Sequence, residues 1–308
     1  MTAPAPHARP EPPAISVVVM GYRDAPTIVR ATRSVVEQAA ADVEIVVVTS
    51  GGDDSAARVR AAFPDLPVVE APTRLLPGGA RNAGVEATRG AVVAFLAADC
   101  AAEPGWVAAR RTLHAAGHPV VASAVTNGER RHPAAWAFHF GVFRPRLGGR
   151  AAGPVSALDP AAHGCSFDRA VLERLGPFDE AVEIGEDTIA VRALDALGVP
   201  VWFEPTVRTM HWGPHTMIDL VRDRYRRGCA RGRVSGPVAD RWVSVVLVWA
   251  LMYRLVPGMW REAGSDRRWV ILSLPWMVAG NAAFLVGFQR AGRRLRGPAP
   301  IPTRPANP

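Results

Sequence analysis

Three acidic residues, Asp99, Glu186 and Asp187, occur at the expected ends of strands and helices, where side chains commonly contact ligands. The apolar run at 91–98, AVVAFLAA, stops at Asp99. A strand that ends on a carboxylate usually places it beside a ligand, and its oxygen atoms are suited to a divalent cation. A second acidic pair, Glu186 and Asp187, opens a helix-like segment. A carboxylate held at a helix start can act as a general base, although Asp also caps helices there.

The elements that must position these side chains alternate between β-branched runs and helix-like segments. Strands are expected at 15–20, 44–48, 67–70, 91–97 and 201–205. Helices are expected at 26–39, 53–62, 79–88, 101–116, 168–175 and 185–198. The alternation predicts an α/β fold with a mostly parallel sheet and flanking helices. Ligands of such sheets bind beyond the carboxyl ends of the strands, so the ends at 21–24, 49–52 and 98–100 should share one edge.

Two segments depart from this alternation. The stretch 126–162 is rich in Gly, Pro, His and Arg and has weak periodicity, which predicts loops with short elements. Near the C-terminus, 242–260 and 269–288 are strongly apolar, and the second has 20 residues without a charge. As one helix it would extend roughly 30 Å, the thickness of a bilayer core. An apolar helical hairpin is therefore expected, either spanning a membrane or lying on it, with a pair of buried core helices as the alternative.

Charge and cysteine usage narrow the class of protein. The formal net charge is +8, and the positive charge is dense in 222–233 and 290–296. Arginine flanks the apolar hairpin more densely than its short loop, which places the flanks in the cytoplasm. Three widely spaced cysteines argue against a disulfide framework and predict reduced thiols. Residues 1–14 are rich in proline and lack an apolar segment, so a disordered tail is expected rather than a signal peptide.

Four segments in this order resemble glycosyltransferase family 2. They read VVVMGYRDAP at 17–26, VVVTSGGDDS at 46–55, GGARNAGVEATRGAVVAFLAADC at 78–100 and GCSFDRAVLERLGPFDEAVEIGEDTIAVRAL at 164–194. The resemblance covers roughly residues 15–230 and identifies the chain as a membrane-associated bacterial member. It implies the α/β domain called GT-A, which binds a nucleotide-diphospho-sugar, and sugar transfer with inversion at the anomeric carbon.

Donor-binding residues follow from matching this sequence to the family's segments. The first strand end supplies Tyr22 and Asp24. The second departs from the family's acidic pattern and offers Thr49 and Ser50, which leaves the nucleotide base open. The third segment is placed over the sugar and diphosphate. It contributes Gly79, Arg81 and Asn82. In the basic run 222–233, which resembles the family's Gln-Arg-x-Arg region, Arg226 is a candidate diphosphate contact, with a basic collar facing lipid headgroups as the alternative for most of the run.

Metal and catalytic residues follow in the same way. The family's Asp-x-Asp motif aligns with 97–99, where only Asp99 is acidic. One carboxylate suffices for Mg²⁺ or Mn²⁺, because phosphates and water supply the other ligands. His211 matches a histidine that joins the metal or the diphosphate. Asp187 matches the family's general base, and Glu186 is expected to support it or touch the acceptor.

The expected enzyme is an inverting glycosyltransferase of the cell membrane with a cytoplasmic catalytic domain. Its expected partners are a nucleotide-sugar donor, a lipid-linked or envelope-glycan acceptor and the membrane, but not nucleic acid. A non-catalytic membrane-tethered module of the same fold stays open as an alternative. The expected organisation is a tail at 1–14, the GT-A domain at 15–230 (halves 15–125 and 126–215, then a basic helix at 216–230), a helical hairpin at 231–290 and a basic tail at 291–308.

Overall fold

A computed structural model describes residues 13–155, 164–235 and 255–294. The chain forms two compact units, each built from separate stretches of sequence. The first unit is formed by Met1–Gly128 and Pro145–Trp212, and the second by Glu129–Arg144 and Gly213–Pro308. The first unit therefore contains almost all of the predicted sheet, and the second contains the C-terminal helices.

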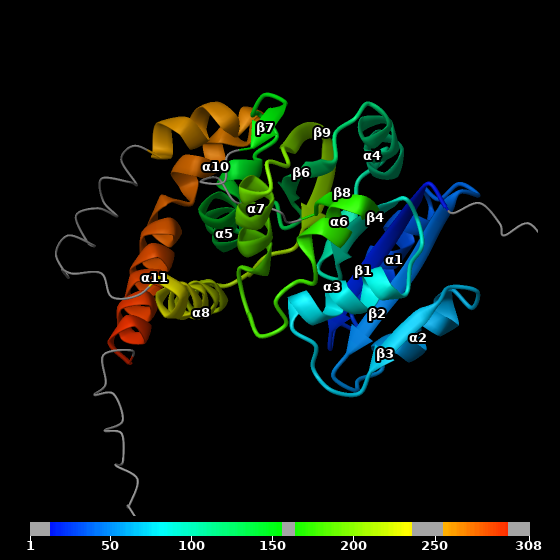
Figure 1. Cartoon of the computed structure of the whole chain (residues 1–308). Helices are drawn as coiled ribbons and strands as arrows, with labels where there is room; N and C mark the ends of the chain where they lie inside the picture. The colour runs from blue at the N-terminus through cyan, green and yellow to red at the C-terminus, as the bar shows by residue number, and fades with distance from the viewer. Residues whose placement is uncertain (1–12, 156–163, 236–254, 295–308) are drawn as a thin grey trace, which may run out of the picture. The chain divides into compact units, whose positions relative to one another are not determined.

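The first unit is built on a nine-stranded sheet, counted over the described residues (Figure 1). Its order is β3 (Val68–Ala71), β2 (Val43–Ser50), β1 (Ile15–Tyr22), β4 (Val92–Ala97), β8 (Ser166–Asp168), β6 (Val120–Asn127), β9 (Val201–His211) and β5 (Cys100–Ala102), with β7 (Gly153–Val155) also paired to β9. The first four strands are parallel, as are β6 and β9, whereas β8, β5 and β7 pair antiparallel. The predicted sheet with a shared carboxyl edge is confirmed, because β1 is the parallel neighbour of both β2 and β4.

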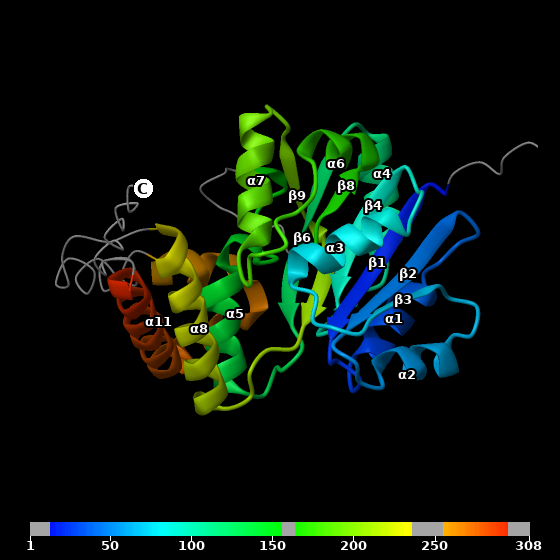
Figure 2. The ribbon, with the colours of Figure 1, turned by 60° about the horizontal axis from the view of Figure 1, so that its bottom comes forward.

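Helices cover both faces of this sheet (Figure 2). They are α1 (Ile28–Val36), α2 (Ser55–Ala62), α3 (Pro77–Glu86), α4 (Trp106–Ala115), α6 (Arg169–Leu175) and α7 (Glu186–Ala196). Alternating residues of β1 divide between two cores, as the period of two in a strand requires. Val18 joins Phe95 and Leu194 in one core, whereas Val17 joins Ile28 and Trp106 in the other.

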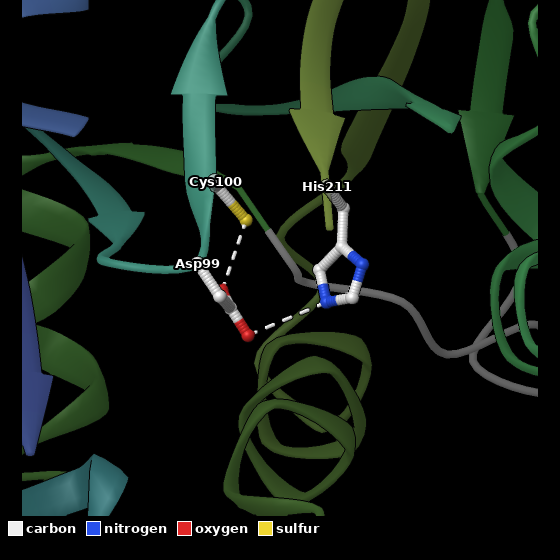
Figure 3. A group of neighbouring side chains, drawn as sticks. All are labelled: Asp99, Cys100 and His211. Carbon is white, nitrogen blue, oxygen red and sulfur yellow. Dashed lines mark hydrogen bonds and ion pairs between the residues drawn. The ribbon is translucent and has the colours of Figure 1, made fainter. Parts of the chain in front are cut away.

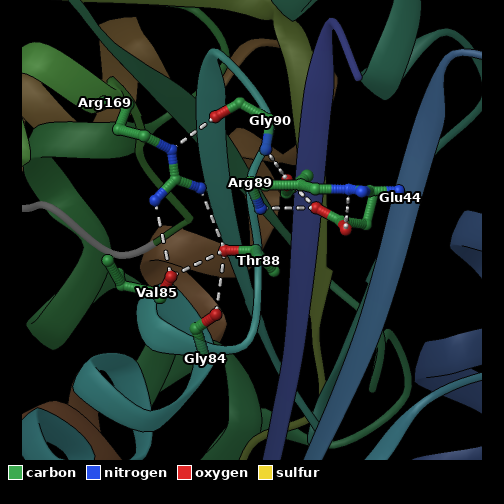
Figure 4. Close-up of polar contacts among 8 residues, drawn as sticks. Glu44, Gly84, Val85, Thr88, Arg89, Gly90 and Arg169 are labelled. Carbon is green, nitrogen blue, oxygen red and sulfur yellow. Dashed lines mark hydrogen bonds and ion pairs between the residues drawn. The ribbon is translucent and has the colours of Figure 1, made fainter. Parts of the chain in front are cut away.

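At the amino end of the sheet, polar contacts hold the connection from α3 to β4 (Figure 4). Arg169 donates through Nε to the Gly90 carbonyl at 2.7 Å and through Nη2 to Thr88 Oγ1 at 3.2 Å. The Glu44 carboxylate accepts from the Arg89 backbone N–H at 2.9 Å. These bonds fix the start of β4, whose other end carries Asp99.

Two expectations for the middle of the chain differ from the structure. The helix expected at 101–116 begins only at Trp106, because residues 100–102 form β5 instead. The stretch 126–162 contains an 11-residue helix, α5 (Pro133–Phe143), besides the 3-10 turn Arg144–Arg146. Almost all of α5 is buried, so it is apolar on every side and lacks the amphipathic period that marks a surface helix.

The second unit is helical where it is described. Besides α5, it contains α8 (Met217–Ser235), a helical segment at 255–262, the 3-10 turn η2 (Gly264–Asp266), α10 (Arg267–Leu272) and α11 (Leu274–Arg294). The rings of Trp136 and Trp269 stack at 5.6 Å and connect α5 to α10. The α8 helix, predicted as the end of the catalytic domain, packs against α11 through glycines, since a Cβ on Gly228 would lie 2.0 Å from the Phe284 carbonyl oxygen.

The predicted apolar hairpin is described only in its second half. Most of the run at 242–260 lies outside the described residues. The run at 269–288 is not the single helix expected, because it breaks at Ser273 and bends by 70°. Pro275 accounts for the break, since it has no N–H to bond to the Ile271 carbonyl of the preceding turn but is tolerated in the first turn of a new helix, here α11. Within the described ranges no single helix has the length and apolar character of a membrane span, whereas Gly264–Leu272 and Leu274–Ala291 meet that test as a bent pair.

Candidate active site

The turn after β1 places Tyr22 and Asp24 at the carboxyl edge of the sheet. Asp24 Oδ2 accepts from the Tyr22 backbone N–H at 2.9 Å, which folds the carboxylate back over the strand end. Gly21 permits this, because a Cβ there would meet Ala98 and Asp24 at 3.0 Å. Burial raises the pKa of Asp24, and the nearby charge of Asp99 acts in the same direction. The carboxylates of Asp24 and Asp99 are therefore close enough for the charge of one to affect the other.

The residues at the carboxyl end of β2 are buried within the protein. Thr49 and Ser50 are both buried, each 3% exposed. The Ser50 hydroxyl donates to the Gly21 carbonyl at 3.4 Å, whereas Thr49 Oγ1 has no hydrogen-bond partner among the described residues. Gly51 adopts φ +97°, and a Cβ there would lie 2.5 Å from the Tyr22 ring. Base contacts by Thr49 and Ser50 stay predictions.

The start of α3 is joined to the Gly-Pro-Phe-Asp-Glu turn far along the chain. A Cβ on Gly78 would lie 2.1 Å from the Asp179 carbonyl oxygen, so only glycine lets the backbone of Asp179 pack this closely against α3. Asn82 bonds in both directions with the backbone of Phe178, at 2.9 Å each, and also donates to Glu180 at 2.8 Å. Gly79 lies against the same Glu180 side chain. Donor contacts by Gly79 and Asn82 stay predictions, whereas their contacts here position the turn that precedes α7.

Arg81 links α3 to the acidic start of α7. Its Nη2 lies 3.2 Å from Glu186 Oε1, and both side chains are almost fully buried. Burial raises the pKa of Glu186, the charge of Arg81 opposes this, and the charge of Asp187 adds to it. Arg81 also lies over the Phe95 ring at 4.9 Å. The pair holds Glu186 inside, while the neighbouring Asp187 is only half-buried and accepts from the Thr188 N–H at 2.7 Å.

Asp99, Cys100 and His211 meet where β5 pairs with β9 (Figure 3). Asp99 Oδ2 lies 3.4 Å from His211 Nε2, and Cys100 Sγ donates to Asp99 Oδ1 at 3.3 Å. The backbone also joins them, because Trp212 N–H donates to the Asp99 carbonyl at 3.0 Å. The Asp99 side chain is half exposed, whereas His211 and Cys100 are buried. The structure therefore brings together the two residues that the sequence predicted as metal ligands.

The donor atoms of this group fit a divalent cation. One candidate ligand atom from each of the three residues lies within 4.8 Å of the others. Burial raises the pKa of the Cys100 thiol well above its usual value, so the sulfur is a neutral donor to Asp99. A carboxylate oxygen and an imidazole nitrogen remain, a pair that suits Mn²⁺ better than Mg²⁺, which prefers oxygen alone. Cys100 was not among the residues predicted from the sequence, although its position next to Asp99 was the available signal.

Arg226 belongs to the second unit, on α8. Its side chain is exposed, whereas its neighbour Arg224 is held within the unit, donating to Asn281 at 3.0 Å and lying 5.0 Å from the Phe284 ring. A diphosphate contact by Arg226 stays a prediction.

Solved structures with the same fold define the class of this protein. A mannosyltransferase from Pyrobaculum calidifontis, in complex with GDP-Man and Mn²⁺, aligns with a TM-score of 0.61 at 18% identity, over 94% of this chain and 89% of that one. TarS from S. aureus, residues 1–349 in complex with UDP-GlcNAc, aligns with a TM-score of 0.54 at 13% identity, over 92% and 91%. The fold is accordingly GT-A-like, with a mixed sheet and flanking helices.

The sequence places the chain within that class. The family model described as glycosyl transferase family 2 matches residues 16–176, just over half of the chain. The succinoglycan biosynthesis protein ExoO of Rhizobium meliloti is 31% identical over 207 residues, which cover 63% of this chain and 59% of that protein. The chain belongs to glycosyl transferase family 2, as its motifs predicted.

Proposed function

We propose that this glycosyltransferase moves a sugar from a nucleotide-diphospho-sugar to a hydroxyl of a growing glycan, with inversion at the anomeric carbon. One observation supports the proposal: the pair of Asp99 and His211, as candidate metal ligands, and the candidate base Asp187 belong to the same edge of the sheet. Asp99 follows the carboxyl end of β4. The α3 helix follows β3 and so starts at that edge, where Arg81 holds Glu186, the residue before Asp187.

Each residue then has a defined task. Asp187 accepts the proton of the acceptor hydroxyl while that oxygen forms its bond to the anomeric carbon. The bond from this carbon to the diphosphate oxygen breaks, and the nucleoside diphosphate leaves from the opposite face. Arg81 and Glu186 keep Asp187 in place through their buried ion pair. Asp24 lies near Asp99 and supports the same edge.

Asp99 and His211 would hold a divalent cation. When bound, the cation supplies positive charge that stabilises the departing diphosphate. The mannosyltransferase structure with GDP-Man and Mn²⁺ supports this use of the fold. The donor pair of Asp99 and His211 supports Mn²⁺ as the ion for this chain.

The acceptor and the location are inferred from the second unit and from the similar proteins. The resemblance to a succinoglycan biosynthesis protein supports a polysaccharide acceptor, presented on a lipid carrier. A membrane position is supported by the bent apolar pair of α10 and α11, on which Ile271, Leu272 and Val286 are exposed. Exposed arginines on α8 other than Arg226, such as Arg222 and Arg231, would each contribute about 1 kcal/mol at an anionic surface.

The donor is tested by incubating the full chain with GDP-mannose, UDP-GlcNAc and other nucleotide-sugars, with Mn²⁺, with Mg²⁺ or with a chelator. We expect release of nucleoside diphosphate from one donor class, faster with Mn²⁺ and lost with the chelator. Nuclear magnetic resonance of the product then reports the anomeric configuration. Retained configuration or chelator-resistant turnover would contradict the proposal. Flotation with anionic vesicles and with neutral ones tests the membrane position. We expect an Arg222→Gln, Arg231→Gln double variant to lose the preference for anionic vesicles.

A further inference from the structure

Two histidines and a glutamate converge in the second unit, and the proposed reaction uses none of them. His215 Nδ1 lies 3.4 Å from Glu129 Oε2, and His132 Nε2 lies 3.9 Å from the same oxygen. The two imidazole rings meet edge to face at 5.5 Å. The side chains are partly open to solvent, with exposed fractions of 22% for Glu129, 49% for His132 and 55% for His215. Two nitrogen ligands and one oxygen ligand thus point at one place.

The spacing of these atoms is close to that of a bound transition-metal ion. One ligand atom from each residue lies within 4.8 Å of the other two. Around a tetrahedral Zn²⁺, with bonds of 2.0–2.1 Å, neighbouring ligand atoms are about 3.3 Å apart. The pair of His215 and Glu129 already meets that spacing at 3.4 Å, and His132 Nε2 lies 3.9 Å from the Glu129 oxygen. All three ligand atoms are thus within about 1.5 Å of the tetrahedral spacing, a difference that side-chain rotation can close.

Local structure fixes the loops that carry the three residues. His132 is the N-cap residue of α5, which begins with Pro133. The Trp136 indole N–H donates to the Arg130 carbonyl at 3.0 Å, and the Arg130 side chain pairs with Asp266 at 2.8 Å. The loop between Glu129 and His132 is therefore held by contacts with both α5 and η2.

The loop before α8 is fixed by a cap. Thr216 Oγ1 accepts from the Asp219 N–H at 3.1 Å, and its hydroxyl donates to the Asp219 carboxylate at 2.6 Å. His215 directly precedes this capping residue, so its backbone direction is set by the helix start. Two helix starts bring partial positive charge to the cluster, which the Glu129 carboxylate offsets.

We propose that Glu129, His132 and His215 form a second metal site, suited to Zn²⁺, that joins the two segments by which the chain enters the second unit. Imidazole nitrogen favours Zn²⁺ over Mg²⁺ or Ca²⁺, and three protein ligands leave one position for water or for another ligand. The strands β6 and β9 are parallel neighbours and end side by side at Asn127 and His211. The chain then passes into the second unit at Glu129 and again at Gly213.

A metal ion bound by these three residues would link the start of α5 to the start of α8. Both segments leave adjacent strands, and in the first unit the Gly128 N–H donates to the His211 carbonyl at 2.9 Å. The site lies next in sequence to the candidate active site but shares no residue with it. Its metal occupancy is therefore open to measurement whether or not sugar transfer is confirmed.

The test measures Zn²⁺ binding to the full metal-stripped chain by isothermal titration. The background variant Cys100→Ser, His211→Ala removes donors of the first group, so that Zn²⁺ bound at Asp99 does not contribute. In this background we expect one equivalent of Zn²⁺ to remain. Adding His132→Ala or His215→Ala should weaken it roughly 100-fold or more, and Glu129→Gln at least about tenfold. His118→Ala is the matched control, since this histidine stacks on Trp202 at 4.3 Å in the first unit.

Co²⁺ provides a second measurement, made in the same Cys100→Ser, His211→Ala background so that the first group does not contribute. The proposed site has no sulfur ligand, so Co²⁺ bound there gives d–d absorption without a thiolate charge-transfer band. We expect this spectrum to be lost in His215→Ala and kept in His118→Ala. Zn²⁺ binding that is unchanged by His132→Ala and His215→Ala, or that occurs only at millimolar Zn²⁺, would overturn the proposal. Circular dichroism of each variant checks that the fold is retained, which the exposure of both histidines favours.

Discussion

The two key carboxylates of the candidate active site occupy different surroundings. Asp99 is half exposed and lies beside His211, a position that suits the proposed ligand of a cation shared with a substrate. Asp187 is half-buried at the start of α7, next to the buried ion pair of Arg81 and Glu186. The first surroundings favour charge-assisted binding, and the second favour transfer of a single proton.

Replacing Asp187 by Asn tests the base. Asn keeps the size of the side chain but accepts no proton, so kcat should fall by about 10²–10⁴-fold, the usual worth of a general base. Donor affinity should stay within a few-fold, because the donor-side residues are untouched. Asp195→Asn, on the exposed far end of α7, is the control and should be neutral. Steady-state kinetics and donor titration measure both quantities, and near-normal kcat in Asp187→Asn would reject the assignment.

Replacing His211 by Gln tests the metal pair. The amide offers an oxygen in place of the imidazole nitrogen, which should lower Mn²⁺ affinity by roughly 10–100-fold and shift the preference toward Mg²⁺. The activation constants of both ions, measured from initial rates, give the ratio directly. His118→Gln leaves the pair intact and serves as the control. An unchanged Mn²⁺ to Mg²⁺ ratio would place His211 outside the metal site.

At this scale the sequence identified candidate residues but not most of their contacts. Asp99 and His211 were found by matching them to a family pattern, and the structure places them 3.4 Å apart. The partners of Asn82 could not be predicted, because Phe178 and Glu180 lie nearly a hundred residues away and only folding brings them together. Thr49 is similar, since its side chain faces the interior and not the edge that its position suggests.

At the scale of elements, a buried polar network joins α4 to β8. Arg110 donates to Ser166 Oγ at 2.8 Å and to the Val121 carbonyl at 3.0 Å, and it lies over the Trp106 ring. Burial lowers the pKa of Arg110 to about 9. Ser166 then gives its own hydrogen to His114 Nε2 at 2.8 Å, so His114 Nδ1–H donates to Asp168 at 2.6 Å. The network fixes a neutral His114.

This network predicts loss of stability in mild acid. Burial lowers the pKa of His114 below its usual value, and the Asp168 carboxylate only partly offsets that effect. The unfolded chain takes up the proton near pH 6.5, whereas the folded chain does so only at lower pH. Because the unfolded state then binds more protons, the free energy of unfolding should fall as the pH drops below about 6.5.

Urea unfolding between about pH 7.5 and pH 5.5 measures this slope. His114→Asn should be less stable at neutral pH, because it loses the two bonds, but its stability should depend less on pH across this window. His215→Asn, which lies in the second unit and outside this network, should keep the slope of the natural chain. An identical slope in His114→Asn would show that another group carries the acid sensitivity.

The elements themselves were predictable where local pattern and tertiary context agree. The strands β1, β2 and β4 have continuous β-branched runs, and their predicted positions are confirmed within a few residues. The α5 helix was missed because eight of its eleven residues are buried, which removes the amphipathic period, and β8 because three residues carry too little pattern. The helix break at Ser273 had a local signal in Pro275, which hydropathy alone overlooks.

At the scale of the whole molecule, the second unit is assembled from two distant stretches of chain around one close helix pair. Both helices contribute glycines to the contact between α8 and α11. A Cβ on Gly228 would lie 2.0 Å from the Phe284 carbonyl oxygen, one on Gly232 2.5 Å from that of Phe288, and one on Gly287 2.2 Å from that of Tyr225. Small residues at such spacing let two helix backbones approach closely, in membranes and in water alike.

Gly228→Ala therefore tests whether this contact organises the unit. Alanine favours helix over glycine by about 1 kcal/mol, so an open site would gain stability. Here the methyl group meets backbone that cannot rotate away, and the helices must separate, at a cost of roughly 1–3 kcal/mol or more. We expect a net loss in the free energy of unfolding and faster proteolysis within α8 and α11. Gly141→Ala is the matched control, because it lies on the exposed side of α5 with its nearest atom at 3.8 Å, and it should be neutral or stabilising. A Gly228→Ala chain as stable as the natural one would mean that α8 and α11 do not pack this closely, and that the second unit depends on contacts other than its glycines.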